Sequence, residues 1–344
     1  MPDEKGGGAD DMMRDMRFGT FVPQGWRFDL VGIEPDQQWE TMRRLAQRAD
    51  DNPDWESIWV YDHFHTTPEP SDEATHEAWS LMSAFGAATS RVRLGQMCTC
   101  MSYRNPAYLA KVAATIDVIS GGRVEMGIGG GWYEHEWRAY GYGFPPAPDR
   151  LGMLDEGVQI FRQAWQHGTS TLQGKHFQVD GARCEPRPLQ PGGIPLWIAG
   201  GGEKVTLKIA ARYADFTNFD GAPEGFTHKS ELLARHCETI GTDFAAIVRS
   251  ANYNVMLGDT EADVEAKLQR MVDRLRPIVG DSRAEGTVGA FRGLPGVGTP
   301  EQVVENLRGM QERGMTYGIC YFPDAAYDRE DLERFEREVI PHVA

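Results

Sequence analysis

An Asp–His pair, Asp62 and His63, directly follows the short apolar run 58–61. The run has the length and composition of a buried strand, and it stops abruptly at these two polar residues. In α/β proteins the carboxyl ends of parallel strands carry the chemistry, because side chains from several strands meet there. An imidazole exchanges protons near neutral pH, and a neighbouring carboxylate can orient it or accept a separate hydrogen bond. The pair therefore predicts proton transfer by His63, although most histidines are only polar surface or core residues.

Three consecutive glycines, Gly200, Gly201 and Gly202, separate an apolar strand from a helix expected over 203–213. Glycine lets backbone N–H groups approach a phosphate, and the helix N-terminus adds a potential that favours an anion. The structural alternative is that the glycines merely allow a tight turn from strand to helix. The position of the turn at a strand end favours an anion site.

The end of another expected strand, at 123–128, carries a second glycine run that includes Gly129 and Gly130. Bare backbone at this position suits an anion or the face of a flat ring. Three aromatic residues follow in the same loop, and they either wall a pocket or pack the end of the fold: Trp132, Tyr133 and Trp137.

A second histidine, His65, makes an H-x-H pattern with His63, as in metal-dependent hydrolases. Such a site needs further ligands at other strand ends, and the remaining histidines do not fall there. The only closely spaced cysteines, Cys98 and Cys100, have no second Cys or His pair at zinc-site spacing. We therefore expect no metal.

The composition bounds the class of protein. A net charge of −16 argues against nucleic-acid and anionic-membrane partners, which need clustered Lys and Arg. No apolar run approaches the length of about 18 residues that a membrane span needs. Five cysteines, an odd number in a chain of 344 residues, favour the cytoplasm over a disulfide framework. Residues 1–16 are polar and acidic, and we expect a disordered leader there, with one folded domain over 17–344.

Apolar runs alternate with segments of helical periodicity along the rest of the chain. The strands are expected at 17–22, 57–61, 92–98, 123–128, 195–199, 214–218, 247–256 and 316–322. A hairpin at 169–185 and a Gly-rich stretch at 277–298 interrupt this rhythm, and the helix before the latter is expected to end at 275. Eight strand–helix units predict a (β/α)8 barrel with insertions after the fourth and seventh strands. The three strand-end stretches described above and a fourth, 97–101 at the end of the third strand, would then meet at one mouth.

Several motifs together resemble the luciferase-like monooxygenase superfamily, over about residues 17–344. They are 59–64 (WVYDHF), 104–107 (RNPA) with Lys111, 117–123 (DVISGGR), 127–132 (GIGGGW) and 195–202 (PLWIAGGG). The Asp–His motif is similar to that of the branch that uses the deazaflavin coenzyme F-420.

The resemblance implies a bacterial-luciferase-like barrel, a homodimer, and a cofactor ring at the carboxyl-end mouth. It implies that His63 is the catalytic histidine with Asp62 beside it. It also implies a non-prolyl cis peptide at Met97-Cys98, on the run that continues to Thr99, behind the ring. The residues matching the phosphate-binding turn are Gly200, Gly201, Gly202 and Glu203, and those under the cofactor are Gly129 and Gly130. An acid that sugar-phosphate dehydrogenases of the family carry is replaced by Trp132, which disfavours a sugar-phosphate substrate.

The leading hypothesis is an oxidoreductase that transfers a hydride between coenzyme F-420 and a small organic substrate, with His63 as proton donor or acceptor. An FMN-dependent monooxygenase on the same barrel is the first alternative. A metal hydrolase using His63 and His65 and a flavin- or deazaflavin-binding protein without its own substrate are the others. The sequence does not identify the substrate or the direction of hydride transfer.

Overall fold

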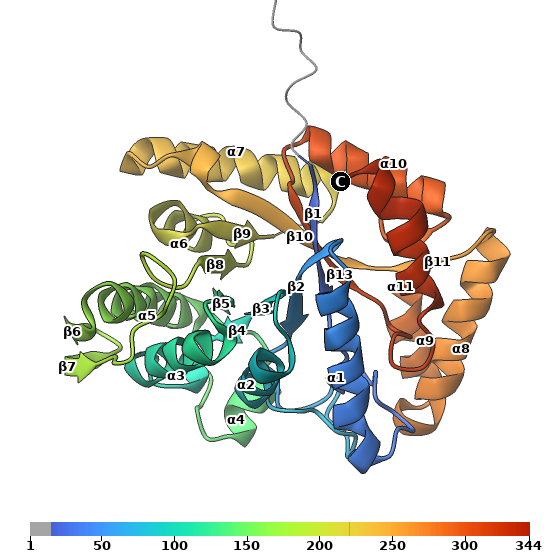
Figure 1. The fold of residues 1–344 in the computed structure, drawn as a ribbon, viewed down its shortest axis with the longest axis horizontal. Coiled ribbons are helices and arrows are strands. Elements are labelled where there is room, and N and C mark those ends of the chain that lie inside the picture. Colours follow the sequence, from blue (N-terminus) through green and yellow to red (C-terminus); the bar gives the residue numbers. More distant parts are fainter. Residues whose placement is uncertain (1–14, 220) are drawn as a thin grey trace, which may run out of the picture.

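The computed structural model describes residues 15–219 and 221–344. Within them, eight strand positions close into a parallel barrel in the order β3-β2-β1-β13-β10-β9-β8-β5, and β3 pairs with β5 to complete the ring. Helices surround the barrel (Figure 1). The predicted (β/α)8 barrel is confirmed, and residues 1–14 of the leader predicted over 1–16 lie outside the described residues.

The strands are β1 (Arg17–Phe21), β2 (Trp55–Val60), β3 (Arg93–Gln96), β4 (Thr99–Cys100), β5 (Val124–Gly129), β6 (Thr169–Gln173), β7 (Gln178–Arg183), β8 (Leu196–Ala199), β9 (Phe216–Asn218), β10 (Val248–Asn254), β11 (Met256–Leu257), β12 (Val297–Gly298) and β13 (Tyr317–Tyr321). The helices are α1 (Pro35–Asp51), α2 (Ala78–Ala88), α3 (Pro106–Ser120), α4 (Glu134–Ala139), α5 (Ala147–His167), α6 (Thr206–Tyr213), α7 (Pro223–Ile240), α8 (Glu261–Val279), α9 (Asp281–Gly289), α10 (Pro300–Glu312) and α11 (Glu330–Arg334).

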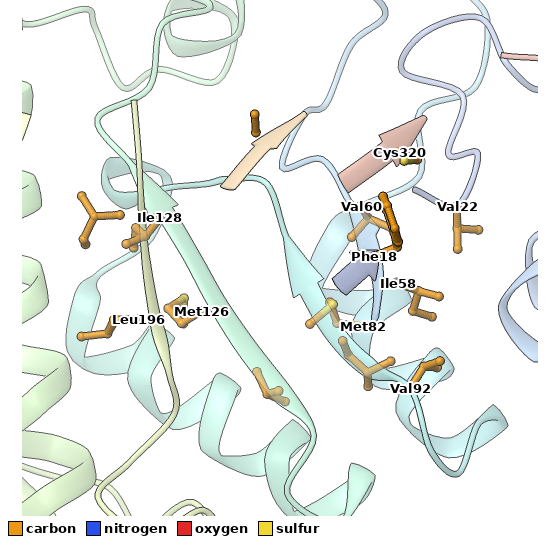
Figure 2. Close-up of a cluster of buried hydrophobic side chains, with 14 of the residues drawn as sticks. Phe18, Val22, Ile58, Val60, Met82, Val92, Met126, Ile128, Leu196 and Cys320 are labelled. Atoms are coloured by element: carbon orange, nitrogen blue, oxygen red, sulfur yellow. The ribbon is translucent and has the colours of Figure 1, made fainter. Parts of the chain in front are cut away.

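Alternation along β2 builds two separate cores. Ile58 and Val60 point outward and join the large cluster between the barrel and its helices (Figure 2). Trp59 and Tyr61 belong to the cluster that fills the barrel. A Cβ on Gly95 of β3 would lie 2.3 Å from Trp59 Cζ3, so only glycine leaves room for the indole. The filled interior closes the barrel below its mouth, which is where a ligand can enter.

Two insertions stand at the predicted places. The antiparallel hairpin β6–β7 lies between β5 and β8, together with α4 and α5. Between β10 and β13, the short strands β11 and β12 pair, and α8 and α9 pack on a small core of their own. Within the described part of the chain, no helix has the length and apolar character needed to cross a bilayer.

Several boundaries differ from the prediction. α8 continues through Pro277 to Val279, because its apolar face stays buried and proline removes only one backbone donor. The 277–298 stretch is not a simple loop, because it contains α9. The first helical residue of α6 is Thr206 rather than 203. Met16 is buried, and its N–H donates to the Val343 carbonyl, so it belongs to the fold rather than to a leader.

Candidate active site

A cavity of about 190 Å³ opens at the carboxyl end of the barrel. The segments that follow β1, β2, β3 and β5 contribute to its wall, and the strands β8, β9 and β10 complete it. The stretch 200–204 after β8, which was expected at the same mouth, is not among the residues that line this cavity. Its lining includes Trp26, Asp62, His63, Met97, Cys98, Tyr103, Trp132, Ala199, Asn218 and Asn252. The enclosed space is smaller than a typical ligand pocket, so a large ligand would extend from it toward the rim.

His63 is held from two sides. Its ring stacks on Trp26, with ring centroids 4.1 Å apart and planes 2° from parallel. Its Nδ1 lies 2.8 Å from Oε2 of Glu136, on α4. The side chain is only 12% exposed, yet it lines the cavity. The imidazole is therefore fixed in position and orientation at the mouth of the barrel.

Glu136 is a buried acceptor for four donors. Besides His63, its carboxylate accepts hydrogen bonds from the hydroxyl of Tyr103 and from the backbone N–H groups of Phe64 and His65. Burial alone would raise the pKa of Glu136, but the hydrogen bonds and the charge interaction with His63 lower it below its ordinary value. The group is thus a carboxylate at neutral pH, so Nδ1 of His63 must donate and Nε2 is the nitrogen left for proton transfer.

Glu136 is a functional residue that the sequence did not predict. Its 73-residue separation from His63 conceals the contact, and α4 lies in a stretch that was expected to be a loop. The available signal was the run Glu134-His135-Glu136 beside the strand-end glycines, since acids near a predicted catalytic histidine are candidates to orient it.

Asp62 is occupied by structural contacts. Its buried carboxylate accepts two hydrogen bonds from the guanidinium of Arg104, at 2.8 and 3.0 Å, and one from the N–H of Cys100. In the part of the chain that the structure describes, no hydrogen bond joins Asp62 to His63. The geometry therefore makes Asp62 the anchor that ties the end of β2 to β4, and Glu136 orients His63 in the way that was expected of Asp62.

The peptide bond between Met97 and Cys98 is cis, at the position that the family resemblance implied. Both residues line the cavity. Burial, with a smaller contribution from the charge of Asp62, raises the pKa of the Cys98 thiol to about 12, so this sulfur is neutral rather than a nucleophile. Thr99 is fully buried and its hydroxyl donates to Gln96, so its side chain supports the strand from behind and does not face the cavity.

The glycines after β5 are closely packed. A Cβ on Gly129 would lie 2.8 Å from Sγ of Cys98, and one on Gly130 would lie 3.2 Å from Leu151. The next residue, Gly131, lines the cavity with a φ of +74°, and a Cβ there would lie 2.5 Å from Sγ of Cys100. Gly129 and Gly130 do not line the cavity themselves. This turn is glycine-rich because it supports the cis-peptide segment.

The glycines after β8 are more exposed, although a Cβ on Gly202 would lie 2.7 Å from Oγ1 of the buried Thr206. Gly200 and Gly202 are exposed, and Gly200 has a φ of +108°. A Cβ on Gly201 would meet only the flexible end of Lys229, whose Nζ would be 2.3 Å away. The carboxylate of Glu203 lies 3.1 Å from Nε2 of His228, so it already has a partner. Exposed backbone beside a lysine amine suits a phosphate, so the anion site at this turn stays a prediction that the geometry favours, and Lys229 is a residue that the sequence did not suggest.

Of the three aromatic residues in the loop after β5, two pack the end of the fold and one walls the cavity. Trp137 is fully buried and packs with Tyr103. Tyr133 is buried, and its hydroxyl donates to the Thr66 carbonyl. Trp132 lines the cavity and is 61% exposed. Only Trp132 therefore both walls the cavity and remains open to a ligand.

The model of the luciferase-like monooxygenase family matches residues 16–317. The chain belongs to that family. An F420-dependent glucose-6-phosphate dehydrogenase of Amycolatopsis mediterranei (strain U-32) is 33% identical over 163 residues, which are 46% of this chain and 47% of that protein. That match thus spans about half the length of the relative. An FMNH(2)-dependent dimethylsulfone monooxygenase of Pseudomonas fluorescens (strain Pf0-1) is 24% identical over 302 residues, 79% of each chain.

Among solved structures, an F420-dependent secondary alcohol dehydrogenase in complex with an F420-acetone adduct superposes with a TM-score of 0.76. It is 21% identical, and the alignment covers 96% of this chain and all of that one. At this identity the likeness establishes the luciferase-like barrel and no more. Membership of the family makes the chain an enzyme of the oxidoreductase class.

The metal-hydrolase alternative does not fit a luciferase-like enzyme, and the geometry also disfavours it. His65 faces His135, with ring centroids 5.0 Å apart, whereas His63 turns to Glu136. In the described residues no group of three or more potential ligands could hold a metal ion. The two histidines of the H-x-H pattern therefore contact different residues.

Proposed function

We propose that this luciferase-like enzyme transfers a hydride between the deazaflavin coenzyme F-420 and a small organic substrate. The observation that carries the proposal is the His63–Glu136 pair at the barrel mouth. Glu136 keeps the proton on Nδ1, so Nε2 of His63 can take a proton from a substrate or, once protonated, give one. A bound deazaflavin supplies or accepts the hydride itself.

The residues present fit such a cofactor. The exposed backbone of Gly200, Gly201 and Gly202, with the amine of Lys229 beside it, would hold a phosphate. Met97 and Cys98 contribute an uncharged wall to the cavity, which suits the face of a flat ring. Asp62 and Arg104 neutralise one another beneath this wall and fix its position.

The chain's own residues then have separate tasks. Trp26 and Glu136 hold the imidazole of His63 in one orientation. The filled barrel below and the aromatic wall beside it limit access of water, which strengthens the hydrogen bond between the imidazole and the carboxylate. Holding the proton-transferring nitrogen still in this way provides the orientation on which efficient transfer depends.

An FMN-dependent monooxygenase is the second candidate, because an FMNH(2)-dependent relative matches 79% of the chain. Titration of the purified protein with F-420 and, separately, with FMN distinguishes the two. We expect tighter binding of F-420, and a preference for FMN would reverse the assignment. Binding of F-420 without turnover of any substrate would instead favour a deazaflavin-binding protein.

The His63→Ala variant tests the proton-transfer role. We expect turnover to fall about 10²- to 10⁴-fold, which is the usual contribution of a positioned acid or base, while F-420 binding changes little. His65→Ala is the matched control, because its ring faces His135 and should leave turnover almost unchanged. Unchanged turnover in His63→Ala would contradict the proposal.

The homodimer and the cytoplasmic location stay predictions, to be tested by sedimentation and by cell fractionation.

A further inference from the structure

The cavity wall beside His63 is dominated by aromatic side chains. Trp26, Tyr61 and Trp132 all line it. The ring of Trp132 approaches that of His63 edge-on, with centroids 5.7 Å apart and planes at 66°. A ligand group that exchanges a proton with His63 must therefore lie against aromatic surface.

Trp132 is held in place although it is 61% exposed. Its ring stacks on Tyr133, with centroids 5.2 Å apart and planes 21° from parallel. Tyr133 is anchored in turn by the 2.9 Å hydrogen bond from its hydroxyl to Thr66. A large indole that is both exposed and supported provides binding area at a small cost in side-chain entropy.

The cations near this wall already have partners. The guanidinium of Arg104 donates to Asp62 and Glu77. Arg150 donates to the carbonyls of Gly131 and Pro145. Among the described residues, no lysine or arginine lines the cavity. The Asp62 carboxylate lines the cavity but is already paired with Arg104. An anionic substrate group would therefore lose water here without gaining a lysine or arginine as counter-ion, and a cationic group would find this carboxylate already occupied, which is unfavourable in both cases.

Uncharged hydrogen-bonding groups also line the cavity. The amide nitrogen of Asn218 donates to Ser250 and Asn252, and both asparagines line the cavity. Amide groups recognise a carbonyl or hydroxyl without requiring it to be ionised. The wall thus combines flat apolar surface with neutral polar groups.

We infer that the substrate of this enzyme is an uncharged molecule with an aromatic or conjugated ring, which stacks on Trp132 and places a neutral polar group near His63. The inference rests on the proposed function, because the molecule that binds here is a substrate only if the enzyme transfers a hydride to or from it. The phosphate-suited turn at Gly200 to Gly202 lies at the β8 side of the mouth, so we assign that turn to the cofactor and Trp132 to the substrate.

Three matched probes test the inference by calorimetry on the protein saturated with oxidised F-420. They are 4-phenylbut-3-en-2-one, its para-carboxylate and its cyclohexyl analogue. We expect the phenyl ketone to bind at least tenfold more tightly than the carboxylate and several-fold more tightly than the cyclohexyl compound, since stacking adds to area burial. Equal or tighter binding of the carboxylate, or no preference for the phenyl ring, would overturn the inference.

Substitutions of Trp132 then test whether the phenyl ketone binds against this side chain. Trp132→Ala should weaken binding of the phenyl ketone about tenfold, and Trp132→Phe, which keeps a stacking face, should restore most of the loss. Trp39→Ala is the control, because Trp39 is 37% exposed on α1 and does not line the cavity. Full affinity in Trp132→Ala would contradict the inference.

The two proposals fail separately. If F-420 itself does not bind, the proposed function is wrong, and the probe titrations on the protein without cofactor still test whether the Trp132 wall selects uncharged rings. If F-420 binds with unchanged affinity in Trp132→Ala but the probes show no preference, only the substrate class is wrong.

Discussion

The two glycine-rich turns at the barrel mouth are alike in sequence and opposite in structure. Gly129, Gly130 and Gly131 follow β5 in a crowded turn, where added methyl groups would approach Cys98, Leu151 and Cys100. Gly200, Gly201 and Gly202 follow β8 in a turn that is largely exposed, where the nearest atoms belong to the side chains of Thr206 and Lys229. We call these the packed turn and the open turn.

The difference shows that glycine serves two purposes at one mouth. In the packed turn it allows close approach between segments, which positions the cis-peptide segment and leads into the loop and helix that carry Trp132 and Glu136. In the open turn it leaves backbone N–H groups accessible to a ligand. Substitutions on the packed side should therefore change stability or proton transfer, and those on the open side should change ligand affinity.

Glu136→Gln should have the largest effect, on the packed side. Glutamine retains the shape but loses the charge that fixes the Nδ1 proton of His63, so we expect turnover to fall roughly 10²- to 10⁴-fold while F-420 affinity is preserved. The pH profile of kcat should also shift, which a purely structural role would not produce. Glu134→Gln, an exposed acid on the same helix, is the control.

The same variant tests the pKa of Glu136. Because this pKa is lowered in the folded state, Glu136 contributes stability above about pH 4.5, the ordinary value, and that stability is lost as the pH falls through the lowered value. The wild type should therefore lose more stability than Glu136→Gln when urea unfolding at pH 7 is compared with pH 3.5. Parallel losses in both proteins would argue against an ionised Glu136.

Gly131→Ala should destabilise the packed turn by about 2–4 kcal/mol, since it combines a positive φ with a collision against Cys100. Gly141→Ala is a matched control, because its φ is +80° and nothing lies within 4 Å of the added Cβ. It should cost about 1 kcal/mol, so the difference measures packing alone. Equal losses in urea unfolding would remove the distinction between the two turns.

Gly201→Ala should act on affinity instead. Its Cβ displaces only the end of Lys229, so we expect a change in unfolding free energy of less than about 0.5 kcal/mol. F-420 binding should weaken about tenfold, because the methyl group separates a phosphate from the backbone and the amine. Loss of stability without loss of affinity would reverse the assignment of the open turn.

Lys229→Met should have the smallest effect. Removal of one cation beside an exposed phosphate site should weaken F-420 binding about threefold to fivefold, and the difference from wild type should shrink as salt is raised. Lys208→Met is the control, because Lys208 is an exposed lysine on the neighbouring helix α6. A salt-independent loss would indicate that Lys229 packs the turn rather than attracting an anion.

Much of this arrangement could be predicted from the sequence. The alternation of apolar runs and helical periodicity determined the eight-unit barrel, because each segment must bury one face. The position of His63 at a strand end followed from the same pattern. The family resemblance located the cis peptide at Met97-Cys98. These features depend on local order along the chain, which the sequence displays directly.

Only the tertiary structure determined which residues contact one another at the barrel mouth. Nothing local distinguishes the packed turn from the open turn, since the contrast arises from Cys98 and Cys100 on one side and from Lys229 on the other. Tertiary contacts also explain why Glu136, rather than the adjacent Asp62, orients His63. Hydrogen bonds and steric contacts act over a few ångströms in space, and residues 73 positions apart become neighbours only when the barrel closes.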